Sequence, residues 1–251
     1  MPVIQLLRQT KPDWFLADAK DGSPITGEAT VLAPGAAQDW RIRLTIAVRE
    51  EGVSVSPEVA VGELPKFCPQ RHINEDGSFC TGYRAGHEIA NHDRAVVWWG
   101  LLHKYLELQR AAGRTRRWPA RQALAHGVAG AHQILAQAAA GRLGVLGQYM
   151  DMLDGHEFWL SSRRIQLNKN SDGLVNGRAA CPVGCKRKKN SPRLRRECCR
   201  KTDLVAVVAH ERLRRLEERN YWSDLRKRRV ECCGTMKNCP LGDSDSGPLA
   251  A

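Results

Sequence analysis

The cysteines of this chain fall into two groups, and their placement is the feature that most constrains its fold. Seven of the nine lie between Cys181 and Cys239, whereas the first 180 residues contain only Cys68 and Cys80. Residues 163–240 also carry 22 lysines and arginines against 8 aspartates and glutamates, a balance of +14 in a chain whose net charge is +12. The sequence therefore predicts an ordinary domain joined to a small, basic, cysteine-rich region.

Length and composition favour a protein with a real hydrophobic core. The chain has 251 residues, of which 42% are hydrophobic, enough for one such domain and an appendage. No apolar run approaches the roughly 20 residues that a membrane-spanning helix needs. The first residues lack the basic stretch and the cleavage site of a secretory signal. We expect a cytoplasmic protein that does not cross a membrane, in which cysteines stay reduced.

Strands are predicted in the first part of the chain and helices after them. Residues 40–48 alternate apolar and mostly polar side chains, the period of a half-buried strand, and residues 27–32 and 53–61 suggest its neighbours. Helices are expected over 92–113, 119–141 and 143–153, with a short one over 4–9. This segregation indicates an α+β domain with an antiparallel meander and flanking helices.

The longest predicted helix of this domain has clear start and stop signals. Asp93 is a candidate N-cap and Gly113 a candidate stop. Apolar residues recur at three- and four-residue spacings, which predicts a buried face of Val96, Val97, Leu101, Tyr105 and Leu108. The neighbouring Trp98 and Trp99 are also expected to pack in the core.

A polar stretch over 161–178 predicts a linker between two regions. The expected organisation is a first domain over 1–160, the linker, a basic cysteine-rich region over 179–240 and a flexible tail over 241–251.

The segment from Leu64 to Tyr83 is neither periodic nor low in complexity. A long irregular segment inside a compact domain usually carries function, because loops on a rigid scaffold display reactive groups. It contains His72, Asn74, Gly77 and Cys80, and it follows a strand that begins at Pro57.

This arrangement resembles the active-site region of ubiquitin-conjugating enzymes, in which a His-Pro-Asn turn and a glycine precede the catalytic cysteine. The resemblance covers about residues 1–155 and is nearest to divergent prokaryotic members, which occur beside a ubiquitin-like protein, an activating enzyme and a metalloprotease in antiviral operons. The chain departs from the eukaryotic pattern in three ways. Ile73 replaces the proline, the spacing from Asn74 to Cys80 is two residues shorter, and Thr81-Gly82 replaces Leu-Asp.

The resemblance implies that Cys80 accepts the C-terminus of a ubiquitin-like modifier as a thioester from an ATP-dependent activating enzyme. The cysteine would then pass the modifier to an amine of a protein acceptor, a step that needs no cofactor. Asn74 would donate a hydrogen bond to the oxyanion, or brace the loop, and His72 would be structural.

Simpler interpretations of these residues stay open. Asn74 can serve only as a turn former. Cys68 has no motif around it and is expected to be structural. His87 and His92 follow the motif and are expected to be solvated.

The remaining cysteines are paired by short gaps across a longer insert, as in structural zinc sites. With one histidine they make eight ligands, enough for two closed sites, although one site with spare thiols is equally allowed. The expected ligands are Cys181, Cys185, Cys198, Cys199, Cys232, Cys233, Cys239 and His210.

Between these cysteines, residues 203–230 predict a helix with Leu204, Val207, Val208, Leu213 and Leu216 on one side and many arginines elsewhere. Such a helix can bind phosphates, so nucleic acid is a possible partner, with a protein partner as the rival. The main alternative function is therefore a zinc-dependent nucleic-acid-binding protein with an inactive conjugating-type fold. A third is a Cys-His hydrolase that uses Cys80 with His72 or His87.

Overall fold

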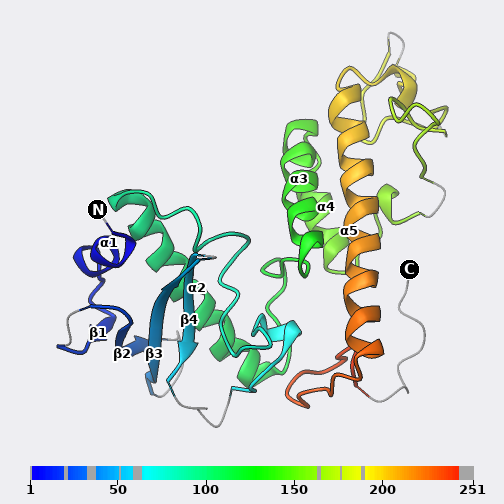
Figure 1. Ribbon diagram of the computed structural model, residues 1–251. Helices are drawn as coiled ribbons and strands as arrows, with labels where there is room; N and C mark the ends of the chain where they lie inside the picture. The colour runs from blue at the N-terminus through cyan, green and yellow to red at the C-terminus, as the bar shows by residue number, and fades with distance from the viewer. Residues whose placement is uncertain are drawn as a thin grey trace. The chain divides into compact units, whose positions relative to one another are not determined.

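The computed structural model describes residues 2–19, 22–32, 38–50, 52–58, 64–162, 165–175, 177–187 and 190–242. These form two compact units (Figure 1). The first takes the chain up to Pro119 and again from Val230, and the second takes Ala120–Arg229. None of the helices in these described ranges combines the length and the apolar character needed to span a bilayer.

The first unit contains a four-stranded antiparallel sheet in the order β1-β2-β3-β4. The strands are β1 (Phe15–Ala17), β2 (Ile25–Val31), β3 (Trp40–Arg49) and β4 (Gly52–Pro57). Their register sets Ile25 against Ile46, and Ile46 against Val55, so that one face of the sheet is apolar and buried. The α+β class and the meander are confirmed. Strand β1 was not predicted, because three residues are too few to show an alternation of apolar and polar side chains. Residues 59–61 of the last predicted strand lie outside the described residues.

Two helices complete the first unit, α1 (Val3–Gln9) and α2 (His92–Thr115), and Figure 1 shows α2 running along the sheet. Leu7 and Phe15 pack with Trp98 and Trp99 in one buried cluster. The indole N–H of Trp99 donates to the carbonyl oxygen of Leu7 over 3.1 Å, which joins the two helices. The predicted burial of both tryptophans is confirmed.

The predicted buried face of α2 is confirmed at Tyr105, whereas Leu108 is only half-buried and the other three residues are exposed. Val96 and Val97 are 49% and 54% exposed, and Leu101 is exposed as well. The buried stripe instead presents the two tryptophans, whose large apolar area outweighs that of the valines. It consists of Ala95, Trp98, Trp99, Leu102, Tyr105, Leu106, Gln109 and Ala112.

The N-cap and the C-terminal end of α2 also differ from the prediction. Asn91 is the N-cap, because its side-chain oxygen accepts from the backbone N–H of Arg94 over 3.0 Å, and Asp93 lies in the first turn. The helix continues past Gly113 to Thr115 and ends at Arg116 in the left-handed conformation.

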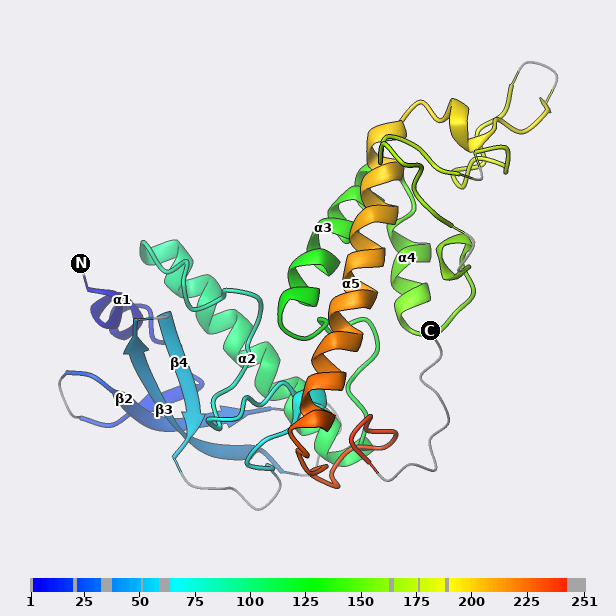
Figure 2. The same cartoon turned by 45° about the vertical axis from the view of Figure 1, so that its right-hand side comes forward.

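The second unit is built on α3 (Val128–Leu143), α4 (Leu146–Leu153) and α5 (Lys201–Lys227), with α3 and α4 beside α5 (Figure 2). Small residues of α3 let the helices approach closely. Ala136, Ala139 and Ala140 share a buried cluster with Val207 and Val208.

Three predictions for this region differ from the structure. Pro119 does not begin a helix; the backbone of 120–127 is held in part by the buried amide of Gln133, which bonds the N–H of Ala125 (2.8 Å) and the carbonyl of Ala123 (2.9 Å). The expected linker is not a spacer, because Ile165 is buried in the same cluster as the helices. The domain boundary therefore falls at residues 119–120 rather than near 161. Residues 243–251 of the expected tail lie outside the described residues.

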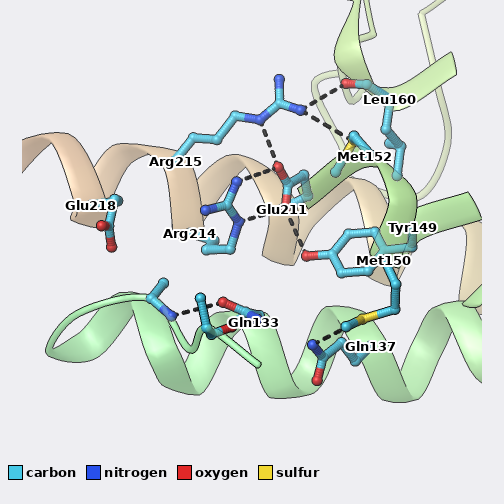
Figure 3. Close-up of polar contacts among 12 residues, drawn as sticks. Gln133, Gln137, Tyr149, Met150, Met152, Leu160, Glu211, Arg214, Arg215 and Glu218 are labelled. Atoms are coloured by element: carbon cyan, nitrogen blue, oxygen red, sulfur yellow. Dashed lines mark hydrogen bonds and ion pairs between the residues drawn. The ribbon is translucent and has the colours of Figure 1, made fainter. Parts of the chain in front are cut away.

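A buried carboxylate joins the helices of the second unit (Figure 3). Glu211 is 2% exposed and accepts hydrogen bonds from Tyr149 Oη (2.7 Å), Arg214 Nε (2.8 Å) and Arg215 Nε (2.6 Å). Burial alone raises the pKa of Glu211, but the hydrogen bonds and the positive charges outweigh it and hold that pKa below its usual value. Arg215 also donates to the carbonyl of Leu160 over 3.2 Å. The network ties α4 and the chain that follows it to α5.

We expect Glu211→Ala to destabilise the second unit by about 3 kcal/mol, because it leaves two guanidinium groups and a phenol without their acceptor. Glu211→Gln keeps the volume and an acceptor, and is the matched control with a smaller loss. Urea denaturation of the full chain, followed by the helical circular dichroism signal, measures both. Unchanged urea midpoints for both variants would show that the network does not stabilise the fold.

Candidate functional site

The irregular segment that contains Cys80 forms a short hairpin. Ile73 makes an antiparallel bridge with Phe79, and the backbone N–H of Cys80 donates to the carbonyl of His72 over 2.8 Å. The loop of the hairpin ends at Gly77, whose φ of +79° suits glycine and closes the turn, with its N–H bonded to the carbonyl of Asn74 (2.9 Å). Cys80 therefore lies on the second strand of the hairpin, three residues after Gly77 and paired with His72.

The hairpin is joined to the sheet and to α2. The N–H of Phe79 donates to the carbonyl of Val55 in β4 over 2.7 Å. Tyr105 Oη of α2 donates to the carbonyls of Arg71 (3.1 Å) and His72 (2.9 Å). The side-chain amide of the fully buried Gln109 also bonds the carbonyl of Arg71, whose guanidinium donates back to the Gln109 amide oxygen over 2.9 Å. Polar side chains of a core helix thus fix the start of the hairpin.

Cys80 is half-buried and carries a free thiol. Burial raises its pKa, and a hydrogen bond from the backbone N–H of Gly82 lowers it by less. At neutral pH the group is therefore mainly the thiol, and it becomes a strong nucleophile only when a proton is removed.

The other two predicted site residues lie on the first strand of the hairpin, opposite the strand that carries Cys80. His72 pairs with Cys80, and Asn74 pairs with Ser78. The Asn74 amide donates to Ser78 Oγ over 3.0 Å, and Ser78 Oγ donates to Asp76 over 2.6 Å. One of the two amide N–H groups of Asn74 is therefore engaged within the loop.

His72 adopts the left-handed conformation (φ 52°), and its ring centroid lies 4.9 Å from that of Trp118. The carbonyl oxygen of His72 accepts hydrogen bonds from Tyr105 Oη and from the backbone N–H of Cys80, so the His72 backbone has a positioning role. His87 and His92 are exposed.

The tail cysteines separate into two groups. In the second unit, Cys185 is hydrogen-bonded to Cys181 and to Cys199, and Cys198 is hydrogen-bonded to Cys181. A turn supports this group, in which the N–H of Gly184 donates to the carbonyl of Cys181 over 3.0 Å.

In the first unit, Cys232, Cys233 and Cys239 lie near Cys68, which hydrogen-bonds Cys233. Hydrogen bonds from Cys68 and Thr235 lower the pKa of Cys233 to about 5. Sequence reasoning missed this place for Cys68. The signal that could have found it is the odd number of tail cysteines, which leaves one of two four-ligand sites incomplete.

The structure corrects the place of His210. It lies within α5, nine residues after the start of the helix, which at 1.5 Å per residue is about 14 Å along its axis. Its Nδ1 is 3.3 Å from Nδ1 of His132 in α3. His210 therefore contacts another histidine, and within the described residues it belongs to no group of three or more potential metal ligands.

The described ranges contain all nine cysteines. Within them, no three or more His, Cys, Asp or Glu side chains are arranged as the ligands of one ion. Hydrogen bonds pair the thiols with one another, so the donor types suit zinc although the side chains do not converge on a common point.

The basic helix α5 is less open than its sequence suggests. Arg214 and Arg215 turn inward to Glu211, and Arg228 pairs with Asp224 on the same helix over 3.0 Å. Leu213 and Leu216, predicted on its apolar side, are exposed.

Comparison with known proteins gives two adjacent family matches. Residues 17–120 match the family described as "Prokaryotic E2 domain", E2 being the ubiquitin-conjugating class, and residues 125–241 match "Cysteine-rich domain, C-terminal to E2 domain". Neither the search of curated proteins nor the search of solved structures returned a match.

The first match contains strands β2 to β4, the hairpin and α2, and the second contains all seven cysteines from Cys181 to Cys239. Residues 17–120 therefore belong to the prokaryotic E2 domain family, and residues 125–241 belong to the cysteine-rich family that follows this domain.

Proposed function

We propose that this protein conjugates a ubiquitin-like modifier, with Cys80 as the residue that carries it. The observation that supports this most is the position of Cys80. It lies on the second strand of a tight hairpin that Tyr105 and Gln109 hold, in a domain of the E2 family. The cysteine is half-buried, so a flexible modifier C-terminus can reach it while the rest of the hairpin stays packed.

The chemistry consists of two acyl transfers. The Cys80 thiol first loses its proton to solvent, and its thiolate attacks the thioester carbonyl that joins the modifier to its activating enzyme. A new S–C bond forms, the C–S bond to the activating enzyme breaks, and the cysteine of that enzyme leaves as a thiolate, which takes up a proton from solvent. An amine of the acceptor protein then attacks the carbonyl on Cys80. An amide forms, the Cys80 thiolate leaves, and the proton of the amine passes to solvent.

Asn74 is the proposed donor to the oxyanion that forms when the amine attacks. Its amide has a second N–H beside the one bonded to Ser78, and a fixed donor of this type contributes about 3 kcal/mol to transition-state stabilisation in other acyl transfers. His72 is assigned to positioning, because the N–H of Cys80 is bonded to its carbonyl.

Zinc is the proposed structural cofactor of the cysteine-rich domain, and none is required for acyl transfer. The partners are the modifier, an activating enzyme and a protein acceptor, as the E2-type domain suggests. Support for the zinc comes from the grouping of thiols and from the small apolar core beside them.

The decisive test is incubation with the modifier, its activating enzyme and ATP. We expect an adduct on a non-reducing gel that thiol reductant removes, because a thioester exchanges with thiols. Cys80→Ala should abolish it, and Cys80→Ser should give an ester that survives reductant. Thr81→Ala, the neighbouring change, should keep it. A thiol-labile adduct that persists in Cys80→Ala would exclude Cys80 as the carrier.

Asn74 can be tested against its role as a loop brace. Asn74→Ala should slow transfer to an amine by about 100-fold and leave loading of Cys80 nearly unchanged, since only the transfer step loses the oxyanion donor. Ser78→Ala breaks the same loop bond but keeps the amide, so its transfer rate should stay near that of the wild type. Single-turnover discharge to lysine measures both. Equal losses in the two variants would assign Asn74 to bracing.

The raised pKa of Cys80 predicts a pH dependence. Alkylation by iodoacetamide requires the thiolate, so the rate at Cys80 should keep rising up to at least about pH 9, later than for glutathione, whose thiol has an ordinary pKa. Mass spectrometry of the Cys80 peptide between pH 7 and 10 gives the profile. A rate that is already constant at pH 7 would instead indicate a thiolate activated by a base, as in the hydrolase alternative.

A further inference from the structure

The chain after α5 belongs to the E2-containing unit. Residues from Val230 onward are part of the first compact unit, although the cysteine-rich family match extends to residue 241. The N–H of Lys237 donates to the carbonyl of Arg116 over 2.8 Å, and the Arg116 guanidinium donates to the carbonyl of Gly234 over 2.9 Å. Gln70, two residues after Cys68, donates to the carbonyl of Asn238 over 3.4 Å.

Few apolar side chains hold this returning segment. Met236 is buried against Cys68 and Ala112, with Trp118 and Cys233 partly buried beside them. So small a cluster is weak support for a segment rich in turns, and segments of this kind commonly depend on a bound metal.

Four thiols lie in this segment and beside it. Cys68 packs in one cluster with Met236 and the partly buried Cys233. Cys68 is hydrogen-bonded to Cys233, and Cys232 to Cys239. The hydrogen bond from Gln70 to the carbonyl of Asn238 brings the neighbours of Cys68 and Cys239 together. All four are free cysteines, and Cys68 and Cys239 are buried.

Positive charge is available to balance thiolates there. Arg71, which is almost fully buried and three residues after Cys68, interacts electrostatically with Cys233. A buried anionic site needs such compensation, and four thiolates around one divalent ion leave two negative charges.

We propose that Cys68, Cys232, Cys233 and Cys239 bind one zinc ion, in a site separate from the one formed by Cys181, Cys185, Cys198 and Cys199. The first site joins a cysteine of the E2 domain to three cysteines about 165 residues later. Four sulfur donors match the closed tetrahedral sites of structural zinc, and soft thiolates favour zinc over hard cations. Binding requires the thiols to lose their protons and to turn from their hydrogen-bonded pairs toward a common centre.

This ion would also support the hairpin that contains Cys80. Cys68 and Ile73 exchange two backbone hydrogen bonds (3.2 and 3.0 Å), and Ile73 pairs with Phe79, the residue before Cys80. Cys68 is therefore a structural residue at the base of the hairpin, and the C-terminal segment braces it through the metal.

The experiment measures zinc in the purified full chain by native mass spectrometry and elemental analysis. We expect two equivalents in the wild type, one in Cys68→Ser, one in Cys185→Ser and none in the double variant. Cys80→Ser should keep two and lose only the reductant-labile adduct, which separates this proposal from the thioester. If Cys68→Ser retains two equivalents, or the wild type holds a single ion that Cys185→Ser removes, the proposed site does not exist.

Alkylation of the wild type covers the case in which Cys68→Ser fails to fold. With zinc present, Cys68, Cys232, Cys233 and Cys239 should resist iodoacetamide together, and a strong chelator should expose all four. Cys80 should react in both conditions. Rapid modification of Cys68 while the other three stay protected would overturn the proposed ligand set.

Discussion

The geometry of the candidate catalytic hairpin depends on hydrogen bonds between α2 and two backbone carbonyls. Tyr105 and Gln109 lie on the buried face of a helix that otherwise packs tryptophan, leucine and alanine against the sheet. They bond the carbonyls of Arg71 and His72, at the point where the chain leaves regular structure. Buried backbone groups without partners are unfavourable, so these side chains determine where an irregular segment can enter the core. They also keep Cys80 next to rigid elements, although it lies in an irregular segment.

Parts of this arrangement could be predicted from the sequence because they have local signatures. The alternation over residues 40–48 predicted β3. The order of His72, Asn74, Gly77 and Cys80 pointed to the irregular segment, and the structure shows that this segment folds as a hairpin. The buried face of α2 could not be read correctly, because the valines and the tryptophans are adjacent, and a rotation of about 100° per residue exchanges which of them face the sheet. The sequence did not indicate that Gln109 is buried and bonded to the carbonyl of Arg71, since a polar residue on a helix ordinarily faces solvent.

The grouping of the cysteines could be predicted from the sequence only in part. Short gaps identified Cys181 and Cys185 as a pair, but nothing local connects Cys68 with Cys233. His210 was chosen to complete a set of eight, yet in the structure its ring lies beside His132 of α3. The boundary near residue 161 failed for a similar reason. A polar composition suggested a linker, whereas Ile165 packs in the core of the second unit.

The return of the chain to its first unit makes the second unit an insertion within a discontinuous domain. Closing a flexible loop of the length of residues 120–229 costs about 4 kcal/mol in chain entropy. Folding of α3, α4 and α5 removes much of that freedom, which lowers the entropy cost of attaching residues 230–242 to the first unit. The helices of the insertion therefore act on the first unit through entropy, and mutations that unfold them should weaken attachment of the C-terminal segment without touching any of its contacts.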